Sequence, residues 1–201
     1  MRIGIFGGTF DPPHLGHMIL AAEASYQLSI DHLLWVITEI PPHKLDHNIT
    51  PLEDRLRLTE KALENEHGFS LSRIEIDRPG PHFAVDTVRL LRQKYPMDEL
   101  FYLMGEDSLR DLPVWHLSAD FVNEVDGIGV MRRPGVFIDR EALEESLPSV
   151  WSKVIFLQTP LVEISASSIR ERIRQGKPFR YFVLPAVYDL IVGEKMYQSR
   201  G

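Results

Sequence analysis

Short apolar runs alternate with longer amphipathic runs along most of the chain, and this alternation constrains the fold more than any other feature. The short runs are rich in Ile, Val, Leu and Phe, which favours β-strands, and the longer runs have helical periodicity. The strand candidates are residues 3–6, 33–38, 70–76, 100–104, 127–131 and 154–157. Most are almost continuously hydrophobic, as is typical of strands covered on both faces. The pattern predicts an α/β fold with a Rossmann-like doubly wound parallel sheet.

Helices are expected in the intervals between the strands. The segment 50–66 begins with Thr50 as a predicted N-cap, Pro51 at the first helical position and Glu53 in the position of a capping box. The other expected helices are 14–29, 84–95, 105–122 with a break near Pro113, 139–147, 166–176 and 184–197. The last two follow the final strand and predict a small C-terminal helical appendage.

The chain shows no internal repeat, low-complexity tract or linker that would separate a second unit. We therefore expect residues 1–201 to form a single domain, with a C-terminal helical portion from about residue 160. The absence of cysteine excludes disulfides and thiolate chemistry.

Charge and hydropathy exclude several classes of partner. A net charge of −7 gives no general attraction for nucleic acid. No apolar stretch approaches the length that spans a membrane, and the N-terminus does not have the pattern of a signal peptide. We expect a cytoplasmic protein that binds neither nucleic acid nor membrane. The sequence leaves the oligomeric state open, a homo-oligomer included.

The stretch GIFGGTFDPPHLGH, residues 4–17, joins the first strand to the first helix. Its paired glycines let a ligand approach the main chain where the strand ends. His14 and His17 are three residues apart and are expected on one face of the first helical turn, with Gly16 leaving the wall between them bare. The spacing is neither the dinucleotide fingerprint nor a Walker motif. Either histidine alone could simply pack or cap, but the whole string favours a polyphosphate site.

Two strings carry a resemblance to a known group of enzymes. GGTFDPPHLGH resembles the signature of the nucleotidyltransferase superfamily with an H-x-G-H motif, and ISASSIRERI resembles its second signature, usually written I-S-S-T-x-I-R. Within that superfamily the chain resembles the bacterial nicotinate-nucleotide adenylyltransferases. IPPHK, GEDSL followed by Trp115, and MRRPG support this choice. The resemblance spans residues 2 to about 197.

The resemblance implies adenylyl transfer from ATP to nicotinate mononucleotide, which gives deamido-NAD and pyrophosphate without a covalent intermediate. A phosphate nucleophile is already anionic at neutral pH, so alignment and charge neutralisation suffice. The catalytic residues are then His14, His17 and Arg170. Mg²⁺ is expected to arrive with ATP, held mainly by phosphates and water, with no metal site on the protein. Nicotinamide mononucleotide or phosphopantetheine as acceptor, and a non-catalytic nucleotide-binding regulator, are the alternatives.

Loops after two of the strands, and the start of a late helix, are expected to bind ATP. The predicted ATP-binding residues are Gly8, Thr9, Phe10, Gly105, Asp107, Ser165, Ser167 and Arg170. The first three would offer main-chain N–H groups, and Asp107 would accept hydrogen bonds from ribose hydroxyls or else cap its helix. Ser165 is an ordinary N-cap in the alternative interpretation. The family's usual pattern differs at Ala166 and Ser167.

The resemblance also implies a mononucleotide site. Its predicted residues are Lys44, Ala84, Asp86, Trp115 and Arg133. Lys44 and Arg133 would reach phosphate, with Arg132 as the second choice, and Trp115 would stack on the pyridine ring unless it belongs to the core. Ala84 stands where the family usually has threonine, and Asp86 either assists there or caps its helix. His43 and His47 are not assigned to a metal, because no third ligand is evident.

Overall fold

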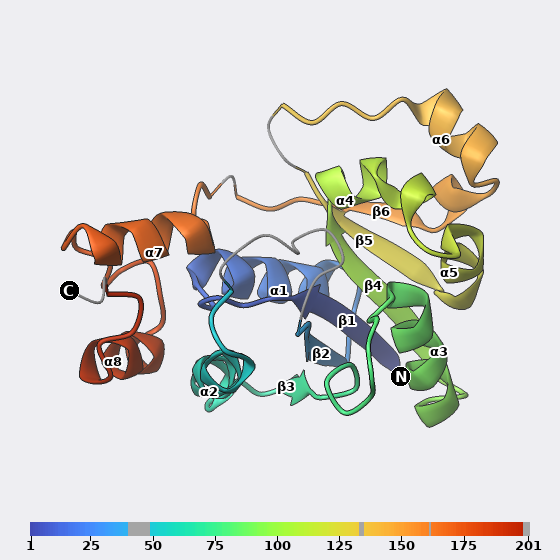
Figure 1. The fold of residues 1–201 in the computed structure, drawn as a ribbon. Coiled ribbons are helices and arrows are strands. Elements are labelled where there is room, and N and C mark those ends of the chain that lie inside the picture. Colours follow the sequence, from blue (N-terminus) through green and yellow to red (C-terminus); the bar gives the residue numbers. More distant parts are fainter. Residues whose placement is uncertain (40–48, 133–134, 161, 199–201) are drawn as a thin grey trace.

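A computed structural model describes residues 1–39, 49–132, 135–160 and 162–198 (Figure 1). Six strands form one sheet in the order β3-β2-β1-β4-β5-β6, and every neighbouring pair is parallel. The strands are β1 Arg2–Gly8, β2 His32–Ile37, β3 Phe69–Ser72, β4 Glu99–Gly105, β5 Gly127–Met131 and β6 Val154–Leu157. This is the strand order of a doubly wound sheet, so the predicted Rossmann-like fold is confirmed.

All six predicted strands form, and one is shorter than predicted. The strand expected over 70–76 ends at Ser72, because the chain turns directly after that residue. The sheet reverses its direction of winding between β1 and β4, which are hydrogen-bonded neighbours. Gly8 pairs with Ile37 and Gly105 pairs with Met131, so these strands end at one edge of the sheet. Ligands of doubly wound folds bind at this edge, near the switch point.

Eight α-helices and two short 3₁₀ helices are formed by the residues that the structure describes. They are α1 Leu15–Gln27, α2 Leu52–Leu63, α3 Ala84–Lys94, α4 Glu106–Arg110, η1 Leu112–Val114, α5 Ser118–Glu124, α6 Arg140–Ser146, η2 Val150–Ser152, α7 Ala166–Arg174 and α8 Pro185–Gly193. The predicted break near Pro113 is confirmed, since α4 ends before it and η1 contains it. None of the described helices is long and apolar enough to cross a membrane.

The capping box predicted at the start of α2 is wrong. The helix begins at Leu52 with Pro51 as its N-cap, and no side chain caps it. The main chain of Thr50 is engaged elsewhere: its N–H donates to the Asp11 carboxylate at 3.2 Å, and its carbonyl accepts from Arg55 at 2.9 Å. Tertiary contacts of Thr50 therefore replace the local cap.

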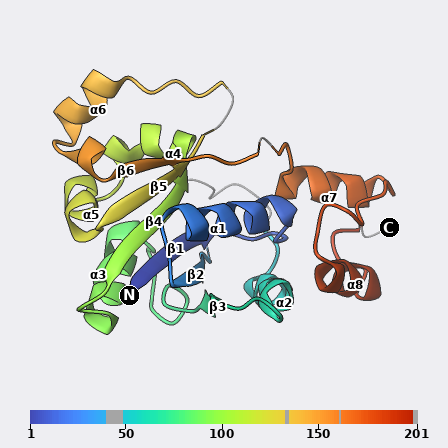
Figure 2. The same cartoon turned by 180° about the vertical axis from the view of Figure 1, so that it is seen from behind.

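Each face of the sheet has its own layer of helices. Successive side chains of a strand point to opposite faces of the sheet. In β2, Leu34 and Val36 pack with α3 and α5, whereas Leu33 and Trp35 pack with α1 and α2. Figure 2 shows α1 lying along its face of the sheet.

A third apolar cluster joins α2 to the two C-terminal helices. It is centred on residues from these three helices, namely Leu58, Ala62, Ile169, Ile173, Val187 and Ile191. Both views place α7 and α8 beside α2 at one end of the molecule (Figure 1, Figure 2). The predicted helical appendage is thus packed against the sheet layer through α2.

Candidate active site

The two histidines at the start of α1 are stacked on each other. His14 is the N-cap of α1 and has an extended backbone, and His17 lies three residues further on. Their ring centroids are 3.6 Å apart and the rings are inclined by 19°. The His14 main-chain N–H donates to His17 Nδ1 at 3.2 Å. A neutral His17 ring therefore carries its proton on Nε2, where it can donate to a ligand.

Burial keeps the His14 ring neutral. The residue is only 6% exposed, and burial lowers the pKa of its imidazole to about 4.

Gly16 makes room for the His14 ring, because a Cβ atom at Gly16 would lie 3.1 Å from His14 Nδ1. The same Cβ would lie 3.7 Å from the carbonyl oxygen of Ile164, in the segment that leads into α7. The first motif thus touches the segment that carries the second.

Helix α7 begins with the predicted serine cap and presents its arginine to the first motif. Ser165 Oγ accepts from the Ser168 main-chain N–H at 3.2 Å and lies 3.1 Å from Ser167 Oγ. Arg170 donates to the main-chain carbonyl of Asp11 at 2.6 Å, and its guanidinium lies 3.5 Å from the Asp11 carboxylate. The structure therefore brings Arg170 next to the segment that carries the two histidines.

Sequence analysis missed Asp11, which connects three segments. This residue is 3% exposed, and besides Arg170 it accepts hydrogen bonds from the Thr50 N–H at 3.2 Å and the Tyr197 hydroxyl at 2.9 Å. Burial and the adjacent Asp11 raise the pKa of Tyr197, so this phenol stays protonated and donates. The signal was present, since Asp11 lies inside the first motif, but its distant partners leave no mark in the sequence.

Arg55 is a second residue that sequence analysis missed. Its side chain is 1% exposed, and its guanidinium donates to main-chain carbonyls on several loops. The acceptors are the carbonyls of Thr9 at 3.0 Å, Thr38 at 2.8 Å, Glu39 at 2.8 Å and Thr50 at 2.9 Å. Arg55 thereby fixes the ends of the loops that follow β1 and β2. Its signal was an arginine on the otherwise apolar stripe of α2.

A pocket of about 540 Å³ opens at the carboxyl edge of the sheet, a volume in the range of small-molecule sites. Residues from five segments line it. They are Gly7, Gly8, Thr9, Thr38, Glu75, His82, Phe83, Ala84, Tyr102, Ser108, Val114, Trp115 and His116. Four predicted site residues, Gly8, Thr9, Ala84 and Trp115, are among them. The ring centroids of Trp115 and Phe121 are 5.5 Å apart, so the Trp115 ring lies between the pocket and the core.

Other predicted site residues lie outside the wall of this pocket. The Phe10 side chain is 1% exposed, and its ring centroid lies 4.7 Å from that of Trp35. Only the main chain of Phe10 is therefore left for the predicted contact with ATP. Asp86 is in the first turn of α3, whose N-cap is Phe83, so the capping alternative for Asp86 is wrong.

The fourth strand ends in the predicted glycine. Gly105 is the last residue of β4 and also the N-cap of α4. Asp107 is the second residue of that helix, so the alternative of Asp107 as the N-cap is wrong. The predicted ribose contact of Asp107 stays a prediction.

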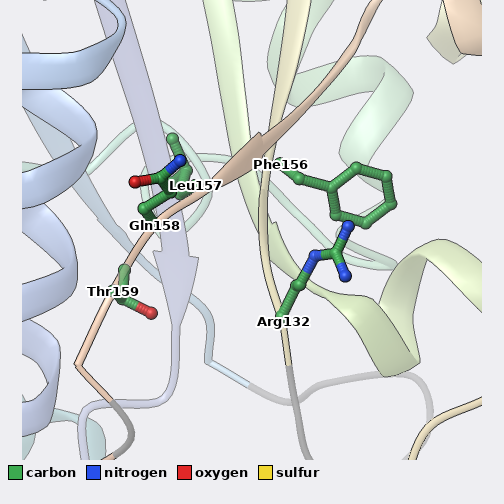
Figure 3. Close-up of a pocket in the computed structure, with 5 residues that line it drawn as sticks. All are labelled: Arg132, Phe156, Leu157, Gln158 and Thr159. Carbon is green, nitrogen blue, oxygen red and sulfur yellow. The ribbon is translucent and has the colours of Figure 1, made fainter.

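Lys44 and Arg133, with His43 and His47, lie outside the described residues. Arg132 is described, and its guanidinium lies 4.7 Å from the centroid of the Phe156 ring. Both line a smaller pocket of about 310 Å³ at the carboxyl ends of β5 and β6, together with Leu157, Gln158 and Thr159 (Figure 3). Among the residues that the structure describes, no group of three His, Asp or Glu side chains could hold a metal ion.

Comparison with known proteins gives the class first. The model of the cytidylyltransferase-like family matches residues 5–172, and the chain belongs to this family. With its doubly wound sheet and its H-x-G-H loop beside α7, the chain is a nucleotidyltransferase.

Relatives then give the particular family. The chain is 40% identical over 198 residues to the probable nicotinate-nucleotide adenylyltransferase of Thermomicrobium roseum, covering 98% of this chain and 92% of that one. It is 36% identical to the nicotinate-nucleotide adenylyltransferase of Bacillus subtilis, covering 98% and 99%. The chain belongs to the nicotinate-nucleotide adenylyltransferase family, as the resemblance predicted.

Solved structures agree on the fold. The nicotinic acid mononucleotide adenylyltransferase of Plasmodium falciparum, complexed with NaAD, matches with a TM-score of 0.77 at 20% identity, covering 98% of this chain and 97% of that one. The same enzyme complexed with APC matches with a TM-score of 0.76.

Proposed function

We propose that the chain transfers the adenylyl group of ATP to nicotinate mononucleotide, which gives deamido-NAD and pyrophosphate, in the biosynthesis of NAD. The observation that carries the proposal is the junction of the two signatures: Arg170 of α7 donates to Asp11 in the loop that stacks His14 on His17. This junction lies at the carboxyl edge of the sheet, next to the glycine-ended strand β1 and its pocket. Such an arrangement suits a chain of phosphates.

The reaction needs alignment more than proton transfer. The 5′-phosphate of the acceptor attacks the α-phosphorus of ATP in line, and the bond from that phosphorus to the oxygen of the departing pyrophosphate breaks. His17 donates from Nε2 to an oxygen of the transferring group, and its hydrogen bond strengthens as negative charge builds. Arg170 neutralises charge on the ATP phosphates, and Ser165 and Ser167 add hydroxyl donors at the start of α7.

The two substrates occupy different parts of the site in this proposal. ATP lies over the main chain of Gly8, Thr9 and Phe10 and reaches Gly105 and Asp107. The mononucleotide occupies the part of the 540 Å³ pocket around Trp115, which stacks on its pyridine ring, whereas Gly8 and Thr9 line the part that ATP approaches. The other contacts of the mononucleotide are Lys44, Ala84, Asp86 and Arg133. Mg²⁺ enters bound to the phosphates of ATP, where it neutralises charge, and the location is the cytoplasm, where ATP is supplied.

A comparison of acceptors tests the proposal. Pyrophosphate release is measured with ATP and each of three acceptors: nicotinate mononucleotide, nicotinamide mononucleotide and phosphopantetheine. We expect the highest kcat/KM with nicotinate mononucleotide. Preference for either of the other two acceptors would overturn the named substrate, and absence of turnover with all three would overturn the enzymatic function.

A further inference from the structure

Two polar side chains in the wall of the large pocket have unsatisfied atoms. Glu75 lies in the turns between β3 and α3, and His82 lies just before α3. They are 5% and 8% exposed, and both line the pocket. Within the described part of the chain, neither Glu75 Oε2 nor His82 Nδ1 has a hydrogen-bond partner. A buried polar atom left unpaired is destabilising, so each position calls for an explanation.

Glu75 is held by the protein through its other carboxylate oxygen, and the other ring nitrogen of His82 lies near a carboxylate. Glu75 Oε1 accepts from the Thr87 hydroxyl at 2.8 Å. His82 Nε2 lies 3.7 Å from the Glu39 carboxylate. Thr87 does not line the pocket, so it holds Glu75 from the protein side. The unpaired oxygen of Glu75 is therefore fixed in place, and burial restricts the His82 ring, so recognition of a ligand costs less entropy.

The surroundings leave the protonation of Glu75 adjustable. Burial raises the pKa of the Glu75 carboxyl, while hydrogen bonds from Thr87 and Thr38 and the neighbouring His82 and Arg78 act in the opposite direction. Tyr102 also lies near this carboxyl. A carboxyl in such a setting can accept a hydrogen bond when ionised or donate one when protonated.

The geometry points to Glu75 and His82 as hydrogen-bonding partners of the acceptor mononucleotide, and so as specificity-determining residues. The inference rests on the proposed function and deepens it. Both residues share the pocket with Trp115, whereas Asp11, where the two signatures meet, is not among the residues that line it. The groups that they recognise are polar groups of the acceptor, either its ribose hydroxyls or the carboxylate on its pyridine ring.

Steady-state kinetics of Glu75→Ala and His82→Ala test the inference. We expect KM for nicotinate mononucleotide to rise about tenfold or more in each variant, which corresponds to the loss of one good hydrogen bond. We expect KM for ATP to stay within about twofold of the wild-type value, because these contacts are not made with ATP. Thermal unfolding reports any loss of the fold separately.

Matched controls are available at the opposite edge of the sheet. Glu99 begins β4 and His32 begins β2, and both lie far along their strands from the carboxyl ends. Glu99→Ala and His32→Ala should leave both KM values unchanged.

Glu75→Gln adds a second experiment. Recovery of acceptor affinity means that the Glu75 carboxyl donates its hydrogen bond, and continued loss means that the carboxyl accepts one.

The acid and amide acceptors distinguish the two polar groups. A loss confined to nicotinate mononucleotide assigns the contact to the carboxylate, and an equal loss with nicotinamide mononucleotide assigns it to the ribose; both outcomes support the inference. Acceptor KM values unchanged in both alanine variants, or KM values for ATP that rise as much, would overturn it. A wild-type chain that does not adenylylate the acceptor fails at the proposed function instead, so the two failures are distinguishable.

Discussion

At the scale of single residues, the stacked histidines have different environments. His17 is anchored through Nδ1, which leaves Nε2 as its donor, whereas His14 is buried and neutral. The ring of His14 therefore acts by shape and by its single proton rather than by charge.

The burial of His14 predicts a dependence of stability on pH. Its pKa is about 4 in the fold against an ordinary value of 6.5. As pH falls below 6.5, the unfolded chain takes up a proton that the folded chain does not. The stabilisation is therefore complete above pH 6.5 and is lost progressively as the pH falls towards 4. The free energy of unfolding of wild type, relative to His14→Asn, should fall by about 2–3 kcal/mol between pH 7 and pH 4.5. Urea titrations at both pH values measure it, and a difference independent of pH would contradict the assignment.

The sequence motifs predicted some of the site residues, whereas others could not be predicted because their contacts join residues far apart in the sequence. His14, His17, Arg170 and Ser165 lie in short local strings whose roles depend on neighbours in the sequence. Asp11 and Arg55 act on main-chain atoms that lie far away in the sequence, and such contacts appear only when the fold is known.

At the scale of elements, α2 matters more than its amphipathic pattern suggested. Its buried face places Arg55 under the loops after β1 and β2. Arg55→Met should lower the free energy of unfolding by about 3–5 kcal/mol, because buried carbonyls lose their donors. Urea unfolding measures this loss of stability. Arg57→Met, two residues further along the same helix, is the control. Arg57 pairs with Glu194 at the surface, so its loss should be much smaller, and equal effects would contradict the role of Arg55.

The segment after α8 also supports the site. Tyr197 donates to Asp11, so Tyr197→Phe should lower the free energy of unfolding by about 1–3 kcal/mol, as expected for a hydrogen bond to a charged group. Tyr188→Phe is the matched control, because no described residue hydrogen-bonds to that hydroxyl and its ring keeps its contact with Phe179. Equal unfolding curves for wild type and Tyr197→Phe would show that the bond to Asp11 adds nothing.

Elements were predicted well where the pattern was strong and local. All six strands came from apolar runs, whereas the capping box of α2 did not form because Thr50 has tertiary partners. The end of β3 was placed too late, because the apolar residues Ile74 and Ile76 continue the strand pattern into turns.

At the scale of the whole molecule, the third apolar cluster couples the C-terminal helices to the rest of the fold. We propose that residues 1–201 form a single domain, since α7 and α8 pack on α2, which in turn covers the sheet. Urea unfolding followed by tryptophan fluorescence and by far-ultraviolet circular dichroism should give one coincident transition. The tryptophans Trp35, Trp115 and Trp151 all precede α7, so a separate unfolding of the helical portion would split the two curves and contradict the single domain.

The proposed function assigns adenylyl transfer to nicotinate mononucleotide to the stacked histidines at the start of α1. Formation of deamido-NAD from ATP and nicotinate mononucleotide, measured by chromatography for wild type and His17→Ala at equal concentration, tests it most directly. We predict that wild type forms the dinucleotide and that His17→Ala is slower by about 10²–10³-fold in kcat while its circular dichroism shows that the fold is retained, as for the loss of a preorganised donor. Comparable rates of dinucleotide formation by the two proteins would contradict the account.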